Sequence, residues 1–332
     1  MTRPRATAAV VLAVLLALLT KVQADPSHDP LGRAGAITGP VGSGGSGGSR
    51  LPATAATVGF ERHHYSIAAR VRPLLVFWLS RSGVGDAVVT RRRAPGEARY
   101  SLLIGSDPDH APRRINRWGY IEENIRGAEA HLIGLMTESD EESPEQAEAS
   151  LRKQAGGHYP FRVIQATVNG EQASSLVTSL VAPENYTFRQ MRTVLGLALR
   201  ESSDGKSRVL RLPPGTRPGF LAALADVMHS PSVSPVNYVY HGRLYELRQT
   251  RTRAIPSVRI ARAQYGPAIE ADFLVTSAYD GEQTRFSMTY ATEGRLAEVP
   301  LAVTYQPRWW MQVELTIDDA ETPPPLSDGM DQ

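Results

Sequence analysis

Three side chains that could perform acid–base or metal chemistry lie close together in the segment GSDPDHAPRRINRWG. Asp107, Asp109 and His110 fall within four residues, and prolines and arginines flank them. Two carboxylates and an imidazole can hold a metal ion or relay a proton, as a hydrolase requires. The Asp-Pro-Asp sequence is also ordinary turn chemistry, because aspartate side chains accept hydrogen bonds from nearby backbone N–H groups. The sequence favours a structural turn and keeps a catalytic loop as the alternative.

A second set of candidates is aromatic and cationic. In VTYQPRWWMQVELTID, which begins at 303, strict alternation puts Trp309 on an apolar face and Trp310 on a polar face beside Arg308. Trp78 lies near the end of another aromatic run, HHYSIAARVRPLLVFWLS. We interpret Trp310, Arg308 and Trp78 as candidate ligand-binding residues, because tryptophan is common at binding surfaces. The alternative is that a loop, a helix or an arginine side chain covers Trp310.

Several other chemistries are not expected. The chain has no cysteine, which removes disulfides, Cys-ligated zinc, iron–sulfur clusters and thiol catalysis. His63 and His64 are neighbours on a strand-like segment, so their rings diverge and cannot share one ion. P-loop, dinucleotide-binding, zinc-protease and kinase motifs are not found in the sequence. We therefore expect neither a metal nor a cofactor.

Charge is nearly balanced along the body of the chain. The net charge is +2, and residues 1–24 contribute three bases and no acid, so +2 − 3 leaves −1 for the rest. A near-neutral body argues against nucleic-acid binding, which requires a surplus of cations. The arginines at 91–93 and between 243 and 262 are expected to form a dispersed, solvated surface. An anionic partner, such as a lipid head group or a glycan, is the alternative.

The two ends of the chain differ from its body. Residues 1–24 have a positive start, an apolar run from Ala8 to Leu19 and small residues at Val22 and Ala24, which is typical of a secretory signal peptide. An uncleaved membrane anchor is the alternative. Residues 25–57 are rich in Gly, Ser and Pro and predict a flexible linker, and the acidic 319–332 segment predicts a disordered tail. No later apolar segment is long enough to span a membrane.

The body, residues 58–318, is predicted to be one α+β domain dominated by antiparallel sheet, forming a curved sheet or partial barrel with about three helices. Strand-like runs occupy its two ends, and helical patterns fall in the middle, within about 143–230. Hairpins are expected about Gly127, Asn169-Gly170, His241-Gly242 and Asp280-Gly281, and a turn is expected at 81–86. Helices are expected at 143–155, 184–201 and 217–230.

These features favour an exported cell-envelope protein, in the periplasm or outside the cell. We interpret it as a non-enzymatic binding or carrier module for an apolar or amphipathic ligand, with a lipid, a glycan or another envelope protein as its partner. A secreted hydrolase that uses Asp107, Asp109 and His110 is the alternative. An apolar cavity beneath the sheet would favour the carrier, and convergence of those three side chains in a cleft would favour the enzyme.

The signal-peptide interpretation makes a direct prediction. We expect cleavage after Ala24, because Val22 and Ala24 place small side chains at the positions that signal peptidases require. N-terminal sequencing of the protein recovered from the envelope fraction measures this. A chain that retains Met1 in the membrane fraction would instead support the membrane-anchor alternative.

Overall fold

The computed structural model describes residues 59–71, 79–111, 116–137, 158–183, 186–201, 206–230, 234–260, 262–308 and 311–318. The predicted signal peptide, linker, tail and 143–155 helix lie outside the described residues, as do Trp78, Trp309 and Trp310. No helix in the described ranges is long and apolar enough to cross a membrane.

Antiparallel strands dominate the structure, and fourteen of them form one continuous sheet in the order β8-β7-β6-β5-β4-β3-β2-β1-β16-β15-β14-β13-β10-β9. Each half of the sheet is an up-and-down series of chain neighbours, and pairing of β1 with β16 joins the halves. The first half consists of β1 Gly59–Val71, β2 Leu79–Ala94, β3 Glu97–Ser106, β4 Trp118–Arg126, β5 Glu129–Thr137, β6 His158–Asn169, β7 Gln172–Pro183 and β8 Lys206–Arg211. The second consists of β9 Val236–Tyr240, β10 Arg243–Ile255, β13 Ala268–Ser277, β14 Gln283–Ala291, β15 Pro300–Arg308 and β16 Met311–Ile317.

Two α-helices and some short elements complete the described structure. The helices are α3 Met191–Glu201 and α4 Phe220–His229. Short 3-10 turns are η3 Phe188–Gln190 and η5 Gly294–Leu296, and β11 Val258–Ile260 pairs with β12 Ala263–Tyr265 in a separate ribbon. The prediction of a mainly antiparallel sheet is confirmed, and the sheet is not closed. The prediction of about three helices is wrong for the described ranges, which hold two; the third expected helix, 143–155, falls outside them.

Alternation of apolar and polar residues explains why these segments form strands with one buried face. In β16, Met311, Val313, Leu315 and Ile317 are buried, and the residues between them are partly exposed. The expected hairpins are confirmed by positive φ angles at Gly127, Gly170, Gly242 and Gly281.

The predicted turn at 81–86 is wrong. These residues belong to β2, where the pairing with β1 shifts register between Ile67 and Ala69. Gly83 has a φ of 64° within this irregularity. Glycine-rich sequence thus marks a β-bulge here, which bends a strand without reversing it.

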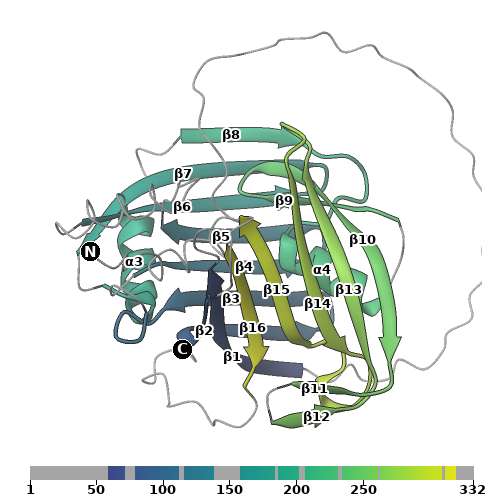
Figure 1. Ribbon diagram of the computed structural model, residues 1–332. Coiled ribbons are helices and arrows are strands. Elements are labelled where there is room, and N and C mark those ends of the chain that lie inside the picture. Colours follow the sequence, from purple (N-terminus) through teal and green to yellow (C-terminus); the bar gives the residue numbers. More distant parts are fainter. Residues whose placement is uncertain are drawn as a thin grey trace, which may run out of the picture.

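The sheet curls so that its two halves face each other. In Figure 1 the strands β15 and β14 cross in front of the strands β3 to β5, and α4 lies between the two layers, in contact with β3 and β10. We call the enclosed surface the inner face. Its apolar core combines residues from both halves, such as Ile67, Ile104 and Ile121 with Phe273 and Phe286. Strand twist and the register shifts in β1–β2, β10–β13 and β14–β15 provide the curvature.

The opposite surface of the first half, the outer face, is covered by α3. Met191, Val194 and Ala198 recur at helical spacing and pack against Trp118 and its neighbours in β4, β5 and β6. The Trp118 and Phe161 rings lie 4.6 Å apart. A capping box formed by Thr187 and Gln190 starts the helical segment. The two helices therefore pack on opposite faces of the sheet.

The β9–β10 turn rests on the inner face of the first half. His241 and Gly242 form a two-residue loop with φ angles of 51° and 67°. A Cβ added at Gly134 of β5 would lie 2.3 Å from His241 Nε2, and one added at Gly242 would lie 2.1 Å from Ser175 Oγ. Glycine at 134 and 242 therefore permits this close approach.

Substitution of two glycines with similar φ angles, Gly242 and Gly83, tests whether the β9–β10 turn packs against Ser175. Gly242→Ala should cost about 3 kcal/mol of unfolding free energy, because the new methyl group meets Ser175 and a left-handed backbone also disfavours alanine. Gly83→Ala, where φ is also positive and no atom lies within 4 Å, should cost only about 1 kcal/mol.

Urea denaturation measures both variants. Adding Ser175→Gly to Gly242→Ala should recover part of the lost stability, because it removes the atoms that clash. Equal losses of unfolding free energy in Gly242→Ala and Gly83→Ala would contradict close packing of the turn against Ser175.

Candidate ligand-binding site at the inner face

A buried carboxylate holds α4 against the sheet. Glu123 is in β4, where alternation directs it to the inner face with Ile121, and it is 1% exposed. Its Oε1 accepts a hydrogen bond from Leu221 N at 2.7 Å, and its Oε2 accepts one from Ala222 N at 2.8 Å. Glu123 thereby supplies the cap that the helix does not receive from its own N-cap residue, Gly219.

Glycine at 219 leaves room for this carboxylate. A Cβ added at Gly219 would lie 2.1 Å from Glu123 Cδ. Burial raises the pKa of Glu123 from about 4.5 to about 7, although the hydrogen bonds from the backbone N–H groups of α4 act to lower it. The carboxyl group therefore changes charge close to neutral pH.

Tyr240 brings a hydroxyl group into the same region. The residue is 7% exposed, and its hydroxyl has no hydrogen-bond partner among the described residues. Its ring stacks on that of His241, with centroids 3.7 Å apart. Burial raises the pKa of Tyr240 well above its ordinary value, so the group remains an uncharged hydroxyl. A buried hydroxyl without a partner costs about 1–3 kcal/mol, so its position calls for a functional explanation.

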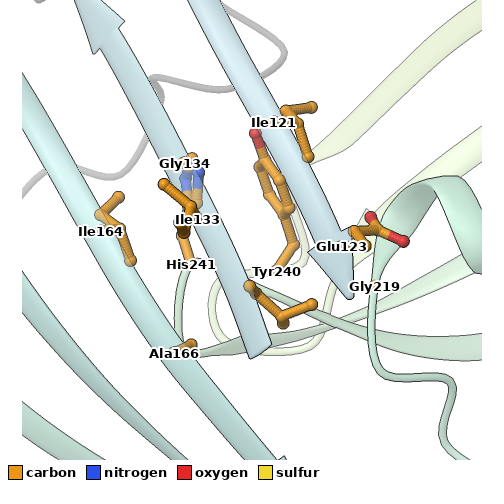
Figure 2. A pocket seen from close by; sticks show the side chains of 10 residues that line it. Ile121, Glu123, Ile133, Gly134, Ile164, Ala166, Gly219, Tyr240 and His241 are labelled. Carbon is orange, nitrogen blue, oxygen red and sulfur yellow. The ribbon is translucent and has the colours of Figure 1, made fainter. Parts of the chain in front are cut away.

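These side chains meet at a small pocket on the inner face, which Figure 2 shows from close by. Strands β4, β5 and β6 provide apolar lining, and Glu123, Tyr240 and His241 are its polar side chains. The full lining is Ile121, Glu123, Leu132, Ile133, Gly134, Ile164, Ala166, Gly219, Tyr240 and His241. The free volume is about 10 Å³, close to the room that one water molecule needs. A larger ligand therefore requires the lining residues at the β9–β10 turn to shift.

The other end of α4 is also held by a carboxylate. His229, the last residue of α4, forms an ion pair with Glu298. Glu298 also accepts hydrogen bonds from Arg91 Nη1 at 3.1 Å and Arg93 Nη1 at 3.2 Å. Burial acts to raise the pKa of Glu298, but the hydrogen bond from His229 and the two arginines hold that pKa below its ordinary value. The helix is thus fastened to the protein at both ends.

The structure brings together two of the three predicted loop residues. His110 Nδ1 lies 2.7 Å from Asp107 Oδ2, and Asp107 Oδ1 accepts a hydrogen bond from Asp109 N at 3.0 Å. The backbone oxygen of Asp107 accepts further bonds from the N–H groups of His110 and Ala111. The hydrogen bond to His110 contributes to a lowered pKa for Asp107, although burial acts to raise it. The Asp109 and His110 side chains are exposed, and all three residues lie apart from the pocket lining.

The three predicted ligand-binding residues are not part of this pocket as the structure describes it. Trp78 and Trp310 lie outside the described residues, and Arg308 pairs with Met311 at the end of β15. Within the described ranges, no cluster of three or more His, Asp or Glu side chains could hold a metal ion.

Glu123, Tyr240 and His241 were not predicted as site residues. One signal was present, because Glu122 and Glu123 are adjacent in the strand-like GYIEENIR and one of them must point inward.

Comparisons with known proteins give no family or relative for this chain. No family model, no curated protein and no solved structure matches it.

The raised pKa of Glu123 predicts how stability varies with pH. Below about pH 4.5 the group is protonated in both the folded and unfolded chain, and from there to about pH 7 only the folded chain keeps the proton. Stability from this group therefore falls as pH rises through that window, by about 3 kcal/mol at its upper end.

Glu123→Gln is the reference for this measurement, because it keeps the shape of the side chain and cannot titrate. We expect the unfolding free energy of the wild type minus that of the variant to decrease by this amount between pH 4.5 and 7, measured by urea denaturation. A difference that stays constant across the window would contradict the assigned pKa.

Proposed function

We propose that this protein is a non-enzymatic binding or carrier module of the cell envelope, which takes an apolar or amphipathic ligand at the inner face of its curled sheet. The observation that carries the proposal is Tyr240, which lines a mostly apolar pocket and whose buried hydroxyl has no hydrogen-bond partner among the described residues. Ligand sites commonly combine an apolar lining with a few polar groups that fix orientation. The signal-like residues 1–24 support an exported protein.

The arrangement around the pocket supports an opening that admits a ligand. The sheet is not closed, so its two halves are separate walls joined along β1 and β16. The two-residue turn His241-Gly242 fills the space above Gly134 and Ser175. In this proposal the turn occupies part of the ligand space when the protein is empty. Movement of a short hairpin tip disturbs fewer contacts than separation of the sheet halves.

A secreted hydrolase is the second candidate, and the hydrogen bond between Asp107 and His110 favours it. A carboxylate that orients an imidazole can help the imidazole to take a proton from water. The neighbouring Ser106 is fully buried, and its hydroxyl bonds with the backbone of Arg117 at 3.3 Å and 2.8 Å. This serine is held by the backbone and is not presented to His110 as a nucleophile, so the binding function has the stronger support.

Binding of the neutral apolar dye N-phenyl-1-naphthylamine to the full chain tests the proposal. We expect a saturable rise in fluorescence, because the dye emits more strongly in an apolar site. Ala166→Leu should weaken dye binding about tenfold, since Ala166 lines the pocket and the larger side chain fills it.

Ala173→Leu is the matched control. Ala173 is also a buried alanine of the same apolar cluster, but it does not line the pocket, so this variant should bind the dye like the wild type. Circular dichroism melting checks that both variants fold. Absence of saturable binding by the wild type, or equal weakening by the two variants, would count against the proposal.

A further inference from the structure

We propose that the ligand has an uncharged head group that accepts a hydrogen bond, such as an alcohol, ester or amide, and that Tyr240 selects it. This inference rests on the proposed binding function and specifies the chemistry of the ligand. It follows from the polar side chains of the pocket lining and from the fact that this lining includes no lysine or arginine.

Glu123 and Tyr240 differ in whether their polar atoms already have hydrogen-bond partners. Both oxygens of Glu123 already accept hydrogen bonds from the N–H groups of Leu221 and Ala222. The Tyr240 hydroxyl makes no hydrogen bond within the described part of the chain, and it remains protonated in its buried position. A hydroxyl that keeps its proton can donate to a carbonyl, ester or hydroxyl oxygen. A ligand with such an oxygen satisfies the group that the protein leaves without a partner.

An anionic head group is disfavoured by the negative charge of Glu123. The charge of Glu123 acts at the Tyr240 hydroxyl, where it opposes formation of a second negative charge. A carboxylate or phosphate head group placed at this hydroxyl would meet the same repulsion. No lysine or arginine lines the pocket to offset it. Burial of an anion here would therefore carry both a desolvation cost and a repulsion.

A cationic head group is also disfavoured. The oxygens of Glu123 are directed at the N-terminus of α4 and accept hydrogen bonds from its backbone N–H groups. A cation would have to compete with these backbone N–H groups for the same oxygens. It would also lose its hydration among Ile121, Leu132 and Ile164.

The free volume of the pocket limits the size of the head group. The pocket that Tyr240 helps to line has a free volume of about 10 Å³, which suits one hydroxyl or carbonyl oxygen. The apolar part of the ligand must then lie along the lining strands, in the space over Gly134 that the His241 ring occupies now. A single-chain neutral amphiphile combines these two properties.

Competition against N-phenyl-1-naphthylamine tests the inference with three probes of equal chain length: 1-decanol, decanoate and decyltrimethylammonium. The full chain is used at about pH 8, where Glu123 is ionised. We expect 1-decanol to displace the dye at a concentration about tenfold lower than either charged probe. Equal or better displacement by decanoate or decyltrimethylammonium would overturn the inference.

Tyr240→Phe identifies the residue responsible. It should weaken 1-decanol binding about tenfold relative to dye binding measured on the same variant, because only the hydroxyl is removed. Tyr245→Phe is the control: Tyr245 packs near Tyr240 but does not line the pocket, so the preference for 1-decanol should remain. An unchanged preference in Tyr240→Phe would also overturn the inference. Failure of the dye itself to bind the wild type would instead overturn the proposed function.

Discussion

Pairing of the first strand with the last one determines the architecture on which the rest of the protein depends. Residues Tyr65 to Val71 of β1 pair with Ile317 to Met311 of β16, and this ladder joins two separate series of antiparallel strands into one sheet. The Tyr65 hydroxyl also donates a hydrogen bond to the backbone oxygen of Pro300, at the start of β15. Because the strands twist and contain bulges, a sheet of this width curls until its halves meet. Burial of Phe273 and Phe286 together with Ile104 and Ile121 is a consequence of that curl.

Packing the two halves creates an electrostatic problem that α4 resolves. A carboxylate on the inner face would be costly without partners, and the first turn of a helix would likewise leave N–H groups without acceptors. Glu123 and α4 satisfy each other, with a glycine at 219 that allows the contact. At the other end, Glu298 gathers His229, Arg91 and Arg93. The helix thus joins strands of the first half to a loop that precedes β15 in the second half.

The pocket that results has a mostly apolar lining, with Glu123, Tyr240 and His241 as its polar side chains. Ile121, Leu132 and Ile164 provide an apolar surface, and the turn at His241-Gly242 rests on that surface where glycine and serine leave space. Tyr240 directly precedes the same turn, and its hydroxyl has no hydrogen-bond partner in the described part of the chain. The proposed binding function accounts for this arrangement, because the pocket combines an apolar wall with a few polar side chains.

The sequence by itself determined the local features of the protein. Alternation in segments such as Met311 to Ile317 predicts strands with a buried face, and glycines at 127, 170, 242 and 281 predict hairpins, because both depend on residues close in the chain. Only the tertiary structure decided that β1 pairs with β16 and that the glycines near 83 form a bulge, since a partner strand sets the register. The candidate site was also decided there. Glu123 meets an α4 residue 98 positions later in the chain, and no local pattern specifies such a contact.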